Sequence, residues 1–168
     1  MRRIITVAFL IVVCFILQNT VFQTLAMASI SPNLLVALTA SFGLMRGRKE
    51  GMLVGFFCGC MVDIFYGDLF GFYALVYMYI GYMNGFFNKI FYDDDLKLPM
   101  MMISVSEFLY SLIIYVFMFL IRTRFEFGYY FIHIILPELV YTIVVTVFLY
   151  RIVNGINRRL ELHEKRSA

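Results

Sequence analysis

Six apolar segments, separated by short polar stretches, constrain the fold of this chain more than any other feature. They cover about residues 4–25, 32–46, 50–66, 70–88, 99–121 and 130–150 of the 168 residues. A helix needs about 20 apolar residues to cross the hydrocarbon core of a bilayer. The pattern predicts an all-α integral membrane protein in which six transmembrane helices form one domain over residues 1–168.

The composition excludes an ordinary water-soluble fold. Hydrophobic residues make up 62% of the chain, charged residues make up 15%, and the mean hydropathy is +0.87. A soluble domain is nearer half apolar and a quarter charged. A chain of this length cannot enclose so much apolar surface, so lipid must cover much of it.

The second and third segments are short for spanning helices. Pro32 is a natural opening for the second segment, which ends near Arg46, and the third begins near Glu50. The two segments either extend into their polar flanks or form a re-entrant pair. Two full crossings are favoured, because the distribution of charge requires them.

Positive charge falls almost entirely on one side of the predicted topology. With a cytoplasmic N-terminus, twelve of the fourteen Lys and Arg residues are cytoplasmic. Only Arg122 and Arg124 lie outside. Loss of one crossing would reverse the later loops, so the bias favours six crossings and two cytoplasmic termini.

The N-terminal segment has a second interpretation. Arg2 and Arg3, the apolar run that follows them and the small residues 26–28 resemble a cleavable signal peptide. Apolar character resumes at Val21, however, and cleavage would leave five crossings. An uncleaved first helix is the favoured prediction.

Glycines recur along the third and fourth segments. Gly51, Gly55 and Gly59 are spaced by four residues and Asp63 continues the interval, while Gly81 and Gly85 repeat it. Such spacing places small residues along one helix face, where another backbone can approach closely. Packing between these two helices is favoured over a face for docking a partner.

Three acidic residues are expected in the membrane: Asp63, Glu107 and Glu138. A carboxylate there is costly unless it is paired, hydrated or protonated. Asp63 either caps the Gly67 turn or the next helix, or contacts a partner or ligand, and the sequence leaves both open. The two glutamates are expected to face the bundle interior, near Tyr hydroxyls or Asn84. A cation or proton path is less favoured, because the acids have no regular spacing.

No pattern indicates an enzyme, a cofactor or a metal site. The three cysteines lie in apolar segments, and Cys58 and Cys60 are two residues apart, on opposite sides of a helix. A phosphate-binding loop, a zinc-binding HExxH and a Ser or Cys triad are missing from the sequence. The basic C-terminal tail suits anionic lipid, and nothing points to nucleic acid.

The order of these motifs resembles the bacterial rod shape-determining protein MreD family. The residues that carry the resemblance are Pro32-Asn33-Leu34-Leu35, Arg46 to Gly51, Gly55, Gly59, Asp63, Gly67, Gly71 to Leu75 and Gly81 to Gly85. They cover about a third of the chain. Asn33 departs from the family, which often has Asp after the Pro, so a role for an acid at that position does not carry over.

The resemblance implies a non-enzymatic scaffold of the cell-elongation complex in the bacterial plasma membrane. It also implies a compact bundle similar to the substrate-binding components of energy-coupling-factor transporters. The implied partners are a bitopic MreC-type protein and, through it, MreB filaments and a RodA-type glycosyltransferase with a class B penicillin-binding protein. The positions singled out as a partner or structural motif are Arg46, Arg48, Glu50, Gly51, Gly55, Gly59, Asp63, Gly67, Gly71, Gly81 and Gly85.

Two other functions remain as alternatives. One is a substrate-binding membrane component of a vitamin-type transporter. The other, a lipid-modifying enzyme, is less favoured, because only Asp63 and Asp68 are polar residues of the required kind near the outer face.

Overall fold

The computed structural model describes residues 2–20, 32–67, 70–90, 97–122 and 127–167. Every regular element in these ranges is a helix, which confirms the predicted all-α class. The α-helices are α1 (Arg2–Asn19), α3 (Leu34–Arg46), α4 (Arg48–Tyr66), α5 (Phe72–Phe86), α6 (Lys97–Arg122), α7 (Phe127–Tyr130) and α8 (Leu136–Ser167). A 3-10 helix, η2 (Phe87–Ile90), follows α5, and a π-helix, η3 (Phe131–Ile135), precedes α8.

The helices follow the apolar segments closely except at the two ends of the chain. Residues 21–25 of the first segment lie outside the described residues. At the other end α8 continues to Ser167, although the apolar segment ends near residue 150. The residues after Tyr150 include Arg, Leu, Glu and Lys, which favour helix as strongly as apolar residues do. A search for apolar runs stops where these charges begin, whereas the helix does not.

Two described helices are long and apolar enough to cross a membrane. The qualifying stretches are Lys97–Phe117 in α6 and Leu136–Leu160 in α8. Two further stretches, Arg3–Asn19 and Leu34–Arg46, are apolar but shorter. Six crossings therefore remain a prediction from the sequence.

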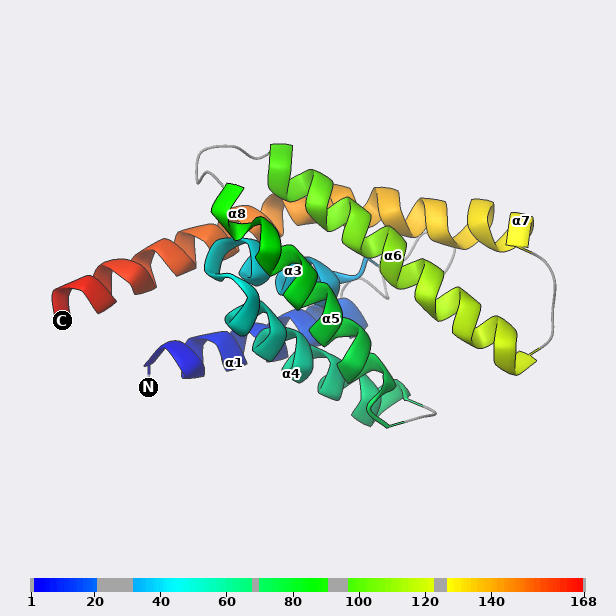
Figure 1. The fold of residues 1–168 in the computed structure, drawn as a ribbon, viewed down its shortest axis with the longest axis horizontal. Helices are drawn as coiled ribbons and strands as arrows, with labels where there is room; N and C mark the ends of the chain where they lie inside the picture. Colours follow the sequence, from blue (N-terminus) through cyan, green and yellow to red (C-terminus); the bar gives the residue numbers. More distant parts are fainter. Residues whose placement is uncertain (1, 21–31, 68–69, 91–96, 123–126, 168) are drawn as a thin grey trace.

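Helix α3 forms the centre of the bundle. Every residue from Leu34 to Met45 is buried, although the helix has only 13 residues. It packs against α1, α4, α5, α6 and α8 (Figure 1). Most of its side chains are apolar, so its burial on all sides supplies much of the hydrophobic core.

The outer surface is rich in exposed apolar side chains. Phe9 on α1, Ile64 on α4, Leu75 on α5 and Phe148 on α8 each expose more than three fifths of their surface. In water so many exposed apolar groups would favour aggregation. In a bilayer the same surface is in its preferred solvent, so this arrangement suits a membrane protein.

The two ends of the described chain lie on the same side of the molecule. Helix α1 begins and α8 ends on the left in Figure 1, and the α3–α4 junction lies near them. The ion pairs of Glu50 with Arg3 and Arg46 join the start of α1 to this junction. The arrangement suits the predicted location of both termini in one compartment.

Candidate functional site

The glycines of α4 and α5 bring the two helix backbones into direct contact. A Cβ atom added to Gly51 would lie 2.5 Å from the carbonyl oxygen of Gly81. One added to Gly59 would lie 2.5 Å from the carbonyl oxygen of Tyr73. Gly55 faces the Tyr77 carbonyl in the same way. No side chain fits between these backbones, so glycine is required along the whole contact.

Helix α3 joins this contact through Gly43, a residue that the sequence analysis did not single out. A Cβ atom at Gly43 would lie 2.7 Å from the Gly81 carbonyl oxygen, and one at Gly51 would lie 2.6 Å from the Gly43 Cα atom. Three helices thus meet at three glycines. Gly43 lies on α3 and Gly51 on α4, so the four-residue spacing within α4 does not extend to Gly43, and nothing local in the sequence marks it.

Four further glycines shape the ends of this three-helix unit. Gly47, between α3 and α4, has a φ angle of 88°, and Gly71, before α5, has a φ angle of 99°. Residues with a Cβ atom rarely adopt such angles. Gly85 lies against the Arg48 backbone, and Gly67 donates its N–H to the Asp63 carbonyl oxygen at 3.1 Å. Gly47, Gly67 and Gly71 lie where the helices turn, whereas Gly85 lets the end of α5 approach the start of α4.

The Asp63 side chain caps α5. Its Oδ1 atom accepts a hydrogen bond from the Tyr73 backbone N–H at 3.0 Å, and its Oδ2 atom accepts one from the Ala74 N–H at 2.8 Å. The first N–H groups of a helix have no partner within the helix and carry partial positive charge. The buried carboxylate satisfies two of them. This geometry is the capping role that the sequence left open for Asp63.

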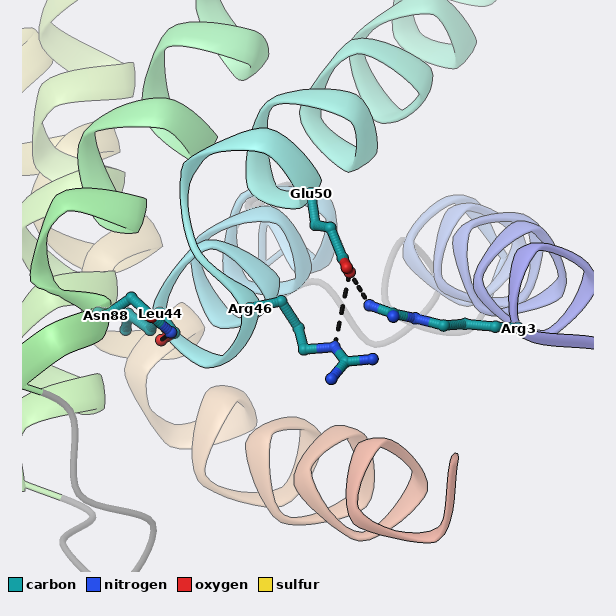
Figure 2. Close-up of polar contacts among 5 residues, drawn as sticks. All are labelled: Arg3, Leu44, Arg46, Glu50 and Asn88. Atoms are coloured by element: carbon teal, nitrogen blue, oxygen red, sulfur yellow. Dashed lines mark hydrogen bonds and ion pairs between the residues drawn. The ribbon is translucent and has the colours of Figure 1, made fainter. Parts of the chain in front are cut away.

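Charged residues gather at the opposite end of α4. Glu50 forms ion pairs with Arg3 of α1 and with Arg46 of α3, the latter at 3.6 Å (Figure 2). The Arg48 guanidinium lies 3.5 Å from the centre of the Phe86 ring of α5, a cation–π contact. These contacts link the ends of four helices.

The last turn of α3 is closed by a residue from η2. The Asn88 side-chain amide donates a hydrogen bond to the Leu44 carbonyl oxygen at 2.6 Å (Figure 2). The last carbonyl groups of a helix need partners from outside it. Asn88 supplies one from a segment forty-four residues away in sequence. Sequence analysis did not identify this residue, because a single Asn in a polar loop has no distinguishing pattern.

A polar network surrounds the start of α3. The Asn33 Oδ1 atom accepts hydrogen bonds from the Val36 backbone N–H at 3.3 Å and from the Tyr77 hydroxyl at 3.0 Å. The Asn33 backbone N–H donates to the Thr142 hydroxyl of α8 at 3.1 Å. Asn33 therefore links α3, α5 and α8. The sequence analysis noted it only as a departure from the family and missed this role.

The remaining buried acids lie on α6 and α8. Glu107 is buried and Glu138 is half-buried, and the two helices that carry them pack against each other. Asn84, considered above as a partner for the glutamates, donates instead to the Ser106 hydroxyl at 2.7 Å. Asp63 lies at the other contact, between α4 and α5. The three predicted acids therefore do not form one cluster.

The candidate site is thus the unit formed by α3, α4 and α5, closed by the Glu50 ion pairs at one end and by Asp63 at the other. Among the described residues, no three His, Cys, Asp or Glu side chains lie close enough together to hold a metal ion. Comparison with protein families finds that the model described as rod shape-determining protein MreD matches residues 1–160. No curated protein and no solved structure matches the chain.

Proposed function

The chain belongs to the MreD family of rod shape-determining proteins, and on that premise we propose that it is a non-enzymatic membrane scaffold of the cell-elongation complex. Family membership assigns it to rod-shape determination and to the membrane. The scaffold role is more specific. It rests on the packing of α3, α4 and α5, which builds a rigid unit and leaves its outer surface available to other membrane helices.

The backbone contact between α4 and α5 is the observation that most supports this role. Helices that touch through glycines have few alternative arrangements, because any shift brings backbone atoms into collision. The Glu50 ion pairs and the Asp63 cap fix both ends of the same unit. A protein that positions other proteins benefits from such a rigid centre.

We place the chain in the bacterial plasma membrane as a single domain with six crossings and both termini in the cytoplasm. Twelve of its fourteen Lys and Arg residues are then cytoplasmic. The exposed apolar residues contact lipid, and the basic end of α8 contacts anionic headgroups. Reporter fusions after Ser167 and at Gly128 test this topology, with cytoplasmic and external signals expected respectively. An external signal at the C-terminus contradicts it.

The direct partner in this proposal is an MreC-type bitopic protein. Through it the chain reaches MreB filaments and the RodA-type glycosyltransferase with its class B penicillin-binding protein. The charged residues Arg46, Arg48 and Glu50 are positioned for contacts on the cytoplasmic side. The apolar faces of α4 and α5 are positioned for contacts within the membrane.

Depletion combined with quantitative co-purification tests the proposal. Depleted cells should become round, and the MreC-type protein should co-purify with the tagged chain. The Gly81→Leu variant should lose both shape support and co-purification at normal membrane levels. Gly155→Leu, where an added Cβ meets no atom of the described residues within 4 Å, should keep both. Normal shape after complete depletion contradicts the proposal. A vitamin-sized ligand that co-purifies in place of the MreC-type protein favours the transporter alternative.

A further inference from the structure

Arg48, at the start of α4, is held in place by an aromatic ring rather than by an acid. Its guanidinium lies 3.5 Å from the centre of the Phe86 ring of α5. Among the described residues, Glu50 forms its ion pairs with Arg3 and Arg46 and not with Arg48. Stacking covers one face of a guanidinium, whereas the N–H donors lie in its plane and stay accessible. Arg48 is therefore an exposed cation with a fixed orientation.

A second exposed cation, Lys89 of η2, lies beside Arg48. Gly85 lies directly against the Arg48 backbone, and Asn88 donates a hydrogen bond to the last turn of α3 at 2.6 Å. These contacts fix the end of α5 and η2 to the α3–α4 junction. Lys89 follows Phe86 by three residues, a spacing that places two side chains on the same side of a helical turn. Lys89 therefore lies on the side of Phe86 and of the guanidinium stacked on it.

The two cations lie apart from the Glu50 ion pairs. Figure 2 shows Asn88, the neighbour of Lys89, on one side of the α3–α4 junction, and Glu50 with Arg3 on the other. Within the part of the chain that the structure describes, neither Arg48 nor Lys89 forms an ion pair. This side of the junction thus carries positive charge that its described neighbours do not balance, and it attracts an anion.

Exposed apolar side chains adjoin these cations. Tyr82 is 37% exposed, Phe86 is 44% exposed and Ile90 is 58% exposed. On the proposed topology this end of α5 lies at the cytoplasmic face, where aromatic side chains occupy the boundary between headgroups and acyl chains. A surface that combines two cations with apolar groups at that depth fits a phospholipid, because the phosphate and the chains each meet a matching part of it.

We propose that Arg48 and Lys89 bind the phosphate group of an anionic phospholipid in the inner leaflet. The guanidinium donates parallel hydrogen bonds to two phosphate oxygens, and the Phe86 ring fixes the plane from which it does so. Lys89 supplies a further N–H donor and a second positive charge. The exposed apolar side chains of α5 contact the acyl chains. This inference rests on the proposed cytoplasmic location of the junction and assigns it a ligand that the scaffold role does not require.

Native mass spectrometry of the full chain in detergent tests the proposal, with phosphatidylglycerol and phosphatidylcholine as the probes. The wild type should bind a single phosphatidylglycerol in preference to phosphatidylcholine. Arg48→Gln should weaken this binding about tenfold, as expected for the loss of charge-assisted hydrogen bonds. Arg48→Lys keeps the charge but not the planar donors and should bind with intermediate affinity. Arg151→Gln removes one positive charge at an exposed position of α8 and should bind as the wild type does.

Lys89→Gln is the second variant, and it serves alone should Arg48→Gln fail to fold. Lys89 is exposed and forms no ion pair with a described residue, so its replacement should weaken phosphatidylglycerol binding without lowering the midpoint of thermal unfolding. Equal binding of the two lipids by the wild type overturns the proposal. Equal weakening by Arg48→Gln and Arg151→Gln also overturns it, because it shows attraction to net charge rather than a site.

Competition separates a phospholipid from other anions. Inorganic phosphate should not displace phosphatidylglycerol, because it has no acyl chains. Displacement by inorganic phosphate overturns the proposal and assigns the cations to a free phosphate compound. Displacement by a polyglutamate peptide overturns it as well and assigns the surface to an acidic protein segment. Phosphatidylglycerol binding that depends on Arg48 supports the proposal even where depletion leaves cell shape normal, a result that contradicts the scaffold role alone.

Discussion

The Asp63 carboxylate at the end of α4 accepts a hydrogen bond from the Ala74 backbone N–H at the start of α5, at 2.8 Å. The α4–α5 hairpin is thereby closed by a side chain rather than by the turn residues alone. The same carboxylate also accepts the Tyr73 N–H, so both of its oxygens are used.

Replacement of Asp63 should destabilise the protein according to how many acceptors are lost. Asp63→Ala leaves two buried N–H groups without partners, and we expect it to cost about 1–3 kcal/mol. Asp63→Asn keeps one acceptor oxygen and should cost less. The midpoint temperature of thermal unfolding in detergent gives the order of stability of these variants. Ile64→Val, at an exposed position on the same helix, should leave the unfolding temperature unchanged, and an equal loss in all three variants contradicts the prediction.

Gly81→Ala should destabilise the bundle although it adds only one methyl group. The new Cβ atom would collide with the Gly51 carbonyl, a backbone group that cannot move aside without shifting α4. Overpacking of this kind costs about 1–3 kcal/mol. The midpoint of thermal unfolding of the purified protein should fall accordingly.

Gly155→Ala is the matched control for that experiment. Gly155 lies within α8, where an added Cβ atom meets nothing within 4 Å in the part of the chain that the structure describes. Alanine stabilises a helix more than glycine does, by up to about 1 kcal/mol, so this variant should be at least as stable as the wild type. Equal effects from the two substitutions would show that steric contact between α4 and α5 is not the cause.

Asn33 and Tyr77 should show energetic coupling. Tyr77→Phe removes the hydroxyl that donates to Asn33, and Asn33→Ala removes the acceptor, so the double variant should lose less than the two single losses added together. We expect a coupling of about 1 kcal/mol. Asn33→Asp retains the acceptor oxygens and should be tolerated better than Asn33→Ala. Strict additivity in the unfolding measurements contradicts the hydrogen bond.

The Glu50 ion pairs should have only a small and salt-dependent effect on stability. Glu50 is 38% exposed at its side chain, and exposed ion pairs contribute about 1 kcal/mol or less. Glu50→Gln should therefore lower stability slightly at low ionic strength and not at high ionic strength, where the charges are screened. Lys49→Gln, at the exposed neighbouring position, provides the comparison. A large, salt-independent loss from Glu50→Gln would show a different role.

The helices and the glycine contact could be predicted from the sequence, because each corresponds to a repeating pattern of residues. Apolar runs marked where helices occur, and the four-residue spacing of Gly51, Gly55 and Gly59 marked a close approach. The length of α8 could not be predicted in this way. Its charged half lacks apolar character, although its residues favour helix.

The polar contacts were harder to predict, because each depends on a single residue and a distant partner. Asn33 pairs with Tyr77 and Thr142, which are 44 and 109 residues away. Nothing local in the sequence marks such pairs. Asp63 stood out because an acid in an apolar segment is costly, but its partners are backbone groups, which the identity of residues 73 and 74 does not reveal.

The enclosure of α3 has a consequence for how the chain enters the bilayer. A helix of 13 residues is about 20 Å long, whereas the hydrocarbon core is about 30 Å thick. On the proposed topology, α3 released alone would leave unpaired peptide groups at its ends in hydrocarbon. Translocation machinery must retain it until α4 and α5 have been synthesised. Ribosome-bound chains that stop before α5 should therefore remain extractable at high pH, and those that include α5 should not.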